Sequence, residues 1–214
     1  MYIPSHFAEH QPEQLHRIMV DNPLGILVRQ GDSGLDADHL PFEWDAKAGA
    51  HGQLSAHIAR ANPLWQRCTN GTPVLVIFSG ANAYISPNWY PSKHETHRQV
   101  PTWNYEVVHA HGRLRVMDEG KFVRRIVALL SHRHEASEGK PWKMGDAPRE
   151  YIEEMLQQIV GIEIDITRLE GKRKLSQNKE SRDRASVIEN LRARDQEAMA
   201  SAIEQAGSRA SESE

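Results

Sequence analysis

Four clusters of polar and aromatic residues interrupt stretches that otherwise resemble β-strands, and their side chains could bind a mononucleotide. They are His39–Phe42, His57–Trp65, Ser86–Tyr90 together with Pro101–Tyr105, and Lys174–Asn178. Arg60 and Lys174 could neutralise a phosphate, since an arginine can pair with phosphate oxygens through two parallel hydrogen bonds. Either Trp89 or Trp103 offers a flat apolar wall for a flavin ring. The groups that could hydrogen-bond a ribityl chain or a pyrimidine edge belong to Asn62, Asn104, Ser176 and Gln177.

The same residues also have an ordinary structural explanation. Aromatic side chains are common in the core of a barrel, and Asn and Ser are common in turns. The sequence contains neither GxGxxG after a strand nor GxxxxGK[ST], which are the standard phosphate-binding loops. A bound nucleotide would therefore be held by side chains on strands and loops, and both explanations stay open from chemistry alone.

The 12 histidines suggest a second kind of chemistry. His109 and His111 would lie on the same face of a strand, where two imidazoles could bind a metal or a haem. No cysteine and no obvious carboxylate accompanies them in the local sequence, and the single Cys68 excludes a CxxC metal site. We therefore expect scattered histidines with ordinary partners and no metal site.

One stretch of the chain is concentrated in positive charge. Residues 168–184 contain seven Lys or Arg against three Asp or Glu, and they could contact phosphates. The formal net charge of the chain is −3, and no helix-turn-helix pattern is recognisable. A solvated helix face with alternating charge explains the stretch better, so direct DNA binding is doubtful.

In the first half of the chain, the elements that must position these clusters are mostly strands. After a short helix at 11–22, period-two patterns and turn residues predict six or seven strands before residue 118, which favours an antiparallel barrel. The run Val74–Phe78 is apolar throughout and predicts a strand buried on both faces. The other expected strands are 24–29 and 35–42, which form a hairpin, 53–60, 83–86 and 102–117.

Helices predominate in the second half. The sequence predicts helices at 118–136 and 148–160, the second capped by Asp146 and ended by Gly161. A strand with one buried face follows at 162–167. We therefore expect α+β architecture: a barrel domain over 1–178 that includes the 118–160 helices, a C-terminal helix at 179–205 and a disordered tail at 206–214.

The expected location is the cytoplasm. The first ten residues lack the pattern of a signal peptide, and no apolar run approaches the roughly 20 residues that span a membrane. With one cysteine, the chain cannot form an internal disulfide.

Taken in order, the clusters resemble the PaiB family of FMN-binding negative transcriptional regulators. The resemblance extends over nearly all of residues 1–195. It is carried by His39-Leu40-Pro41-Phe42, His57–Pro63, Phe78-Ser79-Gly80, Tyr84–Tyr90, Val100–Tyr105, Val108–Gly112, Pro141–Met144, Ile159–Ile164 and Gly171–Asn178.

The resemblance implies an antiparallel split β-barrel related to pyridoxamine-phosphate oxidases and flavin reductases. In such folds two subunits pack barrel to barrel, so it implies a homodimer with FMN at the interface. By analogy, His39, Leu40, Pro41 and Phe42 would line the phosphate and ribityl side together with His57, Arg60 and Asn62. The pocket would be completed by Trp103, Asn104, Lys174, Ser176 and Gln177.

Three functions are compatible with this resemblance, and no catalytic residue is predicted for any of them. The first is negative transcriptional regulation in bacteria, direct or through a partner. The second is an FMN-dependent oxidoreductase or flavin reductase, in which FMN supplies the redox chemistry. The third is a haem-binding or haem-degrading protein that uses His109 or His111.

Overall fold

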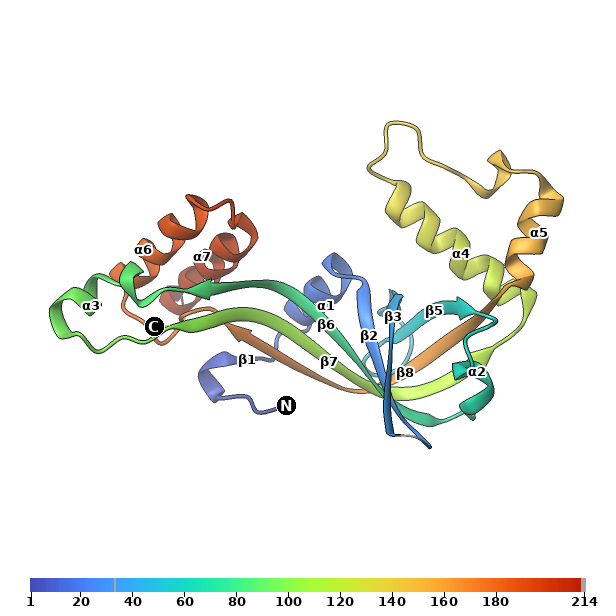
Figure 1. Ribbon diagram of the computed structural model, residues 1–214, viewed down its shortest axis with the longest axis horizontal. Helices are drawn as coiled ribbons and strands as arrows, with labels where there is room; N and C mark the ends of the chain where they lie inside the picture. Colours follow the sequence, from blue (N-terminus) through green and yellow to red (C-terminus); the bar gives the residue numbers. More distant parts are fainter. Residues whose placement is uncertain (33, 213–214) are drawn as a thin grey trace. The chain divides into compact units, whose positions relative to one another are not determined.

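The computed structural model describes residues 1–32 and 34–212 (Figure 1). In this part of the chain eight strands form one sheet in the order β3-β2-β6-β7-β8-β5-β4, and β1 pairs with β8. Seven of the eight strands precede residue 118, as predicted. The strands are β1 (Ala8–Glu9), β2 (Leu24–Gly31), β3 (Gly34–Pro41), β4 (Glu43–Asp45), β5 (Gln53–Ala59), β6 (Thr72–Ile85), β7 (Thr102–Met117) and β8 (Ile159–Lys174).

The chain divides into two compact units. Unit 1 contains residues 1–18, 79–108 and 170–214, and unit 2 contains residues 19–78 and 109–169. Strands β6, β7 and β8 contribute residues to both. This division does not test the predicted domain boundary at residue 178, which stays a prediction.

Unit 2 is built on antiparallel pairs with a helical segment. β2 pairs with β3 in the predicted hairpin and with β6, and β5 pairs with β4 and β8. Gly25 is required for close packing, because a Cβ there would lie 2.8 Å from Val76 Cγ1 and 3.0 Å from Phe42 Cδ2. The helices of this unit are α2 (Leu64–Arg67), α4 (Gly120–Glu135), a 3₁₀ turn (Met144–Asp146) and α5 (Arg149–Gln157).

Two predictions in unit 2 are wrong in detail. In the run Val74–Phe78 only alternate residues are buried, while Leu75 and Ile77 are half-buried, because the strand pairs antiparallel with β2 and only one face is fully covered. Helix α5 ends at Gln157, and its N-cap position is Pro148, not Asp146, with no side-chain cap hydrogen bond. Ile159 and Gly161 lie in β8 opposite Ala59 and His57.

Unit 1 has its own core, formed where short helical elements and a helical hairpin pack on the sheet. The hairpin is α6 (Ser181–Arg192) and α7 (Glu197–Glu212), the last two helices in Figure 1. The other helices of this unit are α1 (Pro12–Asp21, of which residues 19–21 belong to unit 2), the 3₁₀ helices Ser5–Phe7 and Pro87–Trp89, and α3 (Pro91–Thr96). The buried cluster includes Ile85, Tyr90, Leu175, Val187, Leu191 and Ile203.

The single helix predicted at 179–205 is in fact two helices. Asp195 adopts a left-handed conformation with φ of 57°, and the backbone N–H of Gln196 donates to the carbonyl of Leu191 at 3.0 Å. This reversal lets Met199 and Ile203 of α7 pack in the same core as Leu191. Residues 206–212, predicted as disordered, continue α7, and Ala206 packs against that core; residues 213–214 lie outside the described residues.

None of the helices in the described residues is both long and apolar enough to cross a membrane.

Candidate functional site

Unit 1 contains a cavity of about 410 Å³ with aromatic walls, which we call the aromatic cavity. Trp89 and Trp103, which the sequence offered as alternative walls for a flavin ring, both line it. The remaining lining residues come from β6, from α6 and from the turn that follows α6, and they are Asn82, Ala83, Tyr84, Leu191, Arg194 and Gln196.

The two tryptophans are held by specific contacts. Trp103 is 51% exposed, its ring lies edge-on to Tyr84 with centroids 6.1 Å apart, and its Nε1 donates to Asn82 Oδ1 at 3.2 Å. Trp89 ends the 3₁₀ helix Pro87–Trp89, which the hydroxyl of Ser86 caps by accepting from a backbone N–H. Both indoles are therefore positioned without occupying the cavity.

Arg194 supplies the positive charge of the aromatic cavity. Its guanidinium carbon lies 4.7 Å from the centroid of the Trp89 ring, and its Nη1 donates to the carbonyl of Asn190 at 2.7 Å. Among the described residues its Nε and Nη2 make no hydrogen bond, so they can pair with an anion. The cavity can accept a planar aromatic ring and place a negative group beside Arg194.

The sequence pattern did not point to Arg194 as a candidate binding residue. It lies in the region that the pattern predicted as one continuous helix, and the break at Asp195 has no glycine or proline to mark it.

Asn104 and Ser176 lie together, but they do not line the aromatic cavity. Neighbouring residues of a strand point to opposite faces, so Asn104 points inward while Trp103 points out. Asn104 is 1% exposed, and its Nδ2 donates to Ser176 Oγ at 2.9 Å. The Oδ1 of Asn104 is buried and has no hydrogen-bond partner among the described residues. Ser176 adopts a left-handed backbone conformation with φ of 61°.

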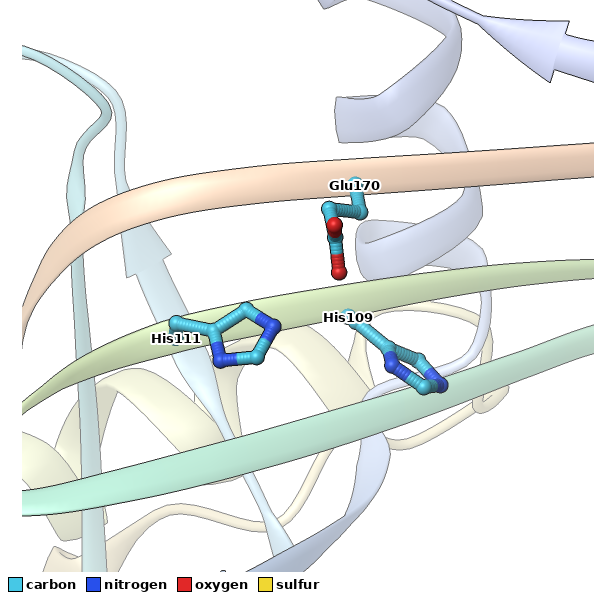
Figure 2. A group of neighbouring side chains, drawn as sticks. All are labelled: His109, His111 and Glu170. Carbon is cyan, nitrogen blue, oxygen red and sulfur yellow. The ribbon is translucent and has the colours of Figure 1, made fainter. Parts of the chain in front are cut away.

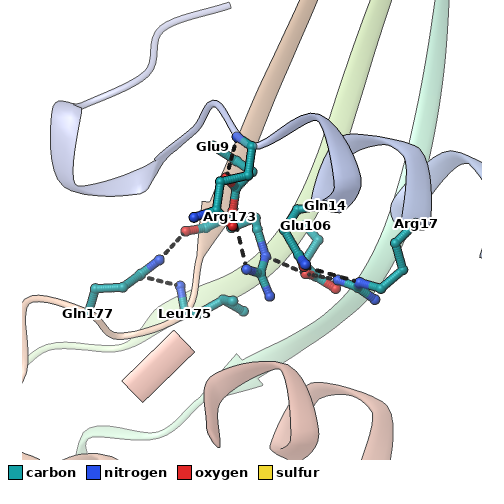
Figure 3. A network of polar contacts seen from close by, with 8 residues as sticks. Glu9, Gln14, Arg17, Glu106, Arg173, Leu175 and Gln177 are labelled. Atoms are coloured by element: carbon teal, nitrogen blue, oxygen red, sulfur yellow. Dashed lines mark hydrogen bonds and ion pairs between the residues drawn. The ribbon is translucent and has the colours of Figure 1, made fainter. Parts of the chain in front are cut away.

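A buried ionic network lies close by in unit 1 (Figure 3). Glu106, 3% exposed, accepts hydrogen bonds from Arg173 Nε at 2.7 Å and from Arg17 Nη2 at 2.8 Å. Arg173 also pairs with Glu9 at 3.3 Å. The amide of Gln177 is used within the same turn, because its Nε2 donates to the carbonyl of Arg173 at 2.6 Å and its Oε1 accepts from the Leu175 N–H. This network fixes the end of β8, and both polar atoms of the Gln177 side chain are used in hydrogen bonds to the backbone.

Most basic side chains of the stretch 168–184 make contacts inside unit 1. Lys174 donates to the hydroxyl of Thr102, and Lys179 donates to Gln99 Oε1 at 2.6 Å. Arg182 binds Glu95 with both Nη atoms, at 2.5 and 2.7 Å. The other basic side chains of the stretch with such contacts are Lys172, Arg173 and Arg184. Phosphate groups would have to compete with these protein partners.

Arg60, the predicted phosphate ligand of unit 2, is likewise engaged. Its Nη1 and Nη2 donate to the two oxygens of Asp118 at 3.0 and 2.5 Å, and its Nε donates to the carbonyl of Gln157 at 2.7 Å. Nη2 also reaches the carbonyl of Ile159. The hydrogen bond from Arg60 lowers the pKa of Asp118. A phosphate would have to displace this carboxylate.

The other predicted residues of unit 2 lie in β3, in β5 and in the segments that directly follow these strands. His39 is exposed, Leu40 and Pro41 are half-buried, and Phe42 packs in the core against Phe78 with ring centroids 5.9 Å apart. Asn62 donates to Asp38 Oδ1 at 2.6 Å and accepts from the Leu64 N–H, so it holds the start of α2. Burial lowers the pKa of His57, which keeps its imidazole neutral near pH 7.

His109 and His111 lie on one face of β7, as their spacing predicted. Their ring centroids are 6.4 Å apart (Figure 2). Glu170, drawn with them, belongs to unit 1, whereas both histidines belong to unit 2. Two imidazoles fall short of the three protein ligands that zinc sites require, so unit 2 by itself gives no reason to assign a metal here.

Comparison with known proteins identifies the family. Residues 1–168 match the family model described as "Putative FMN-binding domain". The chain is 36% identical to an uncharacterized protein of Emericella nidulans, over 89% of this chain and 91% of that protein. It is 31% identical to the protease synthase and sporulation protein PAI 2 of Bacillus subtilis, over 89% of each. Relatives in a fungus and a bacterium leave the predicted bacterial source a prediction.

Two solved structures have the same fold at low sequence identity. The flavocytochrome Anf3 of Azotobacter vinelandii superposes with a TM-score of 0.61 at 11% identity, over 86% of this chain and 78% of that one. The FAD and heme binding protein of Mycobacterium smegmatis gives 0.58 at 14% identity, over 78% of this chain and 73% of that one. The predicted α+β fold with an antiparallel split barrel is thereby confirmed. The chain belongs to the PaiB family of FMN-binding domains.

Proposed function

We propose that this protein binds FMN with the flavin ring in the aromatic cavity of unit 1, and that it acts as a negative transcriptional regulator. The observation that carries the proposal is that Trp89 and Trp103 line one cavity with Arg194 at its edge. The volume of about 410 Å³ lies within the range of roughly 300–1,000 Å³ typical of small-molecule sites.

The residues present suit FMN in two respects. The indoles of Trp89 and Trp103 provide apolar surfaces for a planar ring, and the unpaired Nε and Nη2 of Arg194 suit the phosphate. When bound, FMN would supply redox chemistry, while the protein supplies binding and orientation. Arg194, and not Arg60, is the phosphate ligand in this proposal, because Asp118 already occupies the Arg60 guanidinium.

The regulatory role is supported by the relative in Bacillus subtilis, whose name refers to protease synthesis and sporulation. In our proposal regulation passes through a partner protein or the flavin state. The reason is that Lys174, Lys179 and Arg182 of the basic stretch already have protein partners. From the family resemblance we further propose that the protein is a homodimer. Because the chain has a single cysteine, Cys68, we also propose a cytoplasmic location.

An FMN-dependent oxidoreductase is the second candidate. Trp103 and Tyr84 at the cavity are 51% and 46% exposed, so a flavin beside them would remain accessible to a second reactant. Consumption of NAD(P)H by the FMN-loaded protein would favour this function over regulation alone.

The test of the phosphate contact compares FMN with riboflavin, which lacks the phosphate. Arg194→Ala is expected to weaken FMN binding about tenfold, the size of a lost charge-assisted hydrogen bond, and to leave riboflavin binding unchanged. Arg192→Ala is the matched control, because Arg192 pairs with Glu197 and Glu204 and does not line the cavity.

Equal FMN affinity of the two variants would remove Arg194 from the site. Failure of the wild-type protein to retain FMN during gel filtration would overturn the whole proposal. Promoter DNA that binds tightly at low salt and is released by moderate salt would argue for direct DNA contact instead of a partner.

A further inference from the structure

Unit 2 contains a second cavity, of about 400 Å³, between helices α4 and α5. We call it the α4–α5 cavity. Val127 of α4 and His57 of β5 form two of its walls, and Trp142 and Met144 come from the segment that connects the helices. The face of α5 that borders it carries Tyr151, Ile152, Met155 and Leu156. It shares no residue with the aromatic cavity.

The segment that carries Trp142 and Met144 is held in place by its own hydrogen bonds. The Trp142 N–H donates to Glu135 Oε2 at 2.8 Å, and the Lys143 N–H donates to Asp146 Oδ2 at 2.9 Å. The two helices are joined by an ion pair between Arg124 and Glu153 at 2.6 Å. The cavity is therefore a formed feature of unit 2.

Large apolar side chains remain exposed at its edge. Trp142 is 40% exposed, Tyr151 52% and Met155 42%. Aromatic rings and methionine thioethers are favourable surfaces for other aromatic groups. Exposed apolar residues gathered around a concave site indicate a binding function.

The polar groups of the cavity define the charge of its occupant. None of the described side chains that line it is a carboxylate, a lysine or an arginine; the polar ones are His57, Gln158 and Tyr151. Burial favours the neutral form of His57, whose Nδ1 has no hydrogen-bond partner in the described chain. A charged ligand would lose its hydration here without gaining an opposite charge, which is strongly unfavourable.

We infer that the α4–α5 cavity binds a small, uncharged aromatic compound. The volume suits a small ligand, the walls suit flat rings, and the lining described above offers no positive charge to pair with the phosphate of FMN. The cavity thus gives the protein a second ligand site, in addition to the flavin site proposed above.

The probe for this site is N-phenyl-1-naphthylamine, an uncharged dye whose fluorescence rises in apolar surroundings. With the full chain we expect saturable binding of one dye per chain in the presence of saturating FMN, because FMN then fills the aromatic cavity, which could otherwise accept an aromatic dye. The anionic dye 1-anilinonaphthalene-8-sulfonate should bind at least tenfold more weakly. Met155→Glu should weaken binding of the uncharged dye at least tenfold, because it places a carboxylate at the cavity.

The control variant is Leu129→Glu, since Leu129 has the same 42% exposure but does not line the cavity. It should bind the dye like the wild type. Tyr151→Glu provides a second charged variant in case Met155→Glu fails to fold, as judged by circular dichroism. Trp103→Ala should leave dye binding intact, so failure of the flavin proposal would not be mistaken for failure of this one.

Absence of saturable binding, or equal loss in Met155→Glu and Leu129→Glu, would overturn the inference. The inference would also be overturned if the wild type did not bind the dye and if Met155→Glu, but not Leu129→Glu, changed the oligomeric state. In that case the exposed apolar residues form an interface between copies of the chain.

Discussion

At the residue scale, side chains of one type can either bind a ligand or stabilise the fold, and only their hydrogen-bond partners distinguish these two roles. Arg60 and Arg194 are both arginines near aromatic rings, yet Arg60 is bound by Asp118 and two backbone carbonyls while Arg194 keeps unpaired donors. The sequence identified Trp89 and Trp103 by residue type. The predicted strand 102–117 contains both Trp103 and Asn104, so alternation places them on opposite faces, whereas residue type alone put them in one pocket.

Arg60→Ala tests this distinction. The guanidinium links the end of β5 to Asp118 before α4 and to the junction of α5 with β8, so its loss should lower the midpoint of thermal unfolding. FMN affinity should stay within about twofold of wild type, a change below 0.5 kcal/mol. A tenfold loss of FMN affinity at unchanged thermal stability would return Arg60 to the binding site.

His57 makes stability depend on pH with a defined sign. Burial lowers its pKa from the ordinary 6.5, so below pH 6.5 the unfolded chain binds a proton that the folded chain resists. The contribution of neutral His57 to the free energy of unfolding should therefore be complete above pH 6.5, and it should decrease as the pH is lowered. Burial lowers the pKa of His16 as well, and this contributes with the same sign.

The variant His57→Leu isolates the contribution of His57. Urea unfolding of this variant between pH 5 and 7.5 should show a shallower dependence on pH than the wild type. At pH 7.5 its stability should equal or exceed that of the wild type by up to about 1 kcal/mol, because an unpaired buried nitrogen is removed. Parallel pH curves for the two proteins would contradict the account.

At the element scale, periodicity predicted the elements better than their ends. The hairpin of β2 and β3, strand β7 and helix α4 follow alternation or a helical stripe, and the structure has them within a few residues of the predicted bounds. The end of α5 and the break between α6 and α7 were missed. Both are set by tertiary contacts: the pairing of β8 with β5 in one case and the turn at Asp195 in the other.

Gly161 shows a case in which packing against the rest of the fold, and not the local sequence, decides the structure of a residue. It was predicted to end a helix, whereas it lies in β8, where a Cβ would be 2.4 Å from Phe122 Cδ1 and 2.7 Å from the Met117 carbonyl oxygen. Gly161→Ala should lower the free energy of unfolding by about 1–3 kcal/mol through overpacking. Gly145→Ala, which has no neighbour within 4 Å, should change it by less than about 0.5 kcal/mol in the same urea titration.

At the scale of the whole molecule, family and fold could be predicted because motifs from nearly the entire chain occur in order. The family model matches residues 1–168, whereas the aromatic cavity also uses Leu191, Arg194 and Gln196 beyond that range. The proposed site therefore depends on the α6–α7 hairpin, whose geometry the family resemblance did not describe. This is why the cofactor could be predicted from sequence while a complete set of contacts could not.

The most direct test of the central claim is an FMN titration, followed by flavin fluorescence, of wild type, Trp103→Ala and Trp142→Ala. Trp103 is 51% exposed and lines the aromatic cavity, whereas Trp142 is 40% exposed and lies in unit 2. The account predicts that Trp103→Ala weakens FMN binding about tenfold and that Trp142→Ala leaves it unchanged. Wild-type affinity in Trp103→Ala, or an equal loss in both variants, would contradict the placement of FMN in the aromatic cavity.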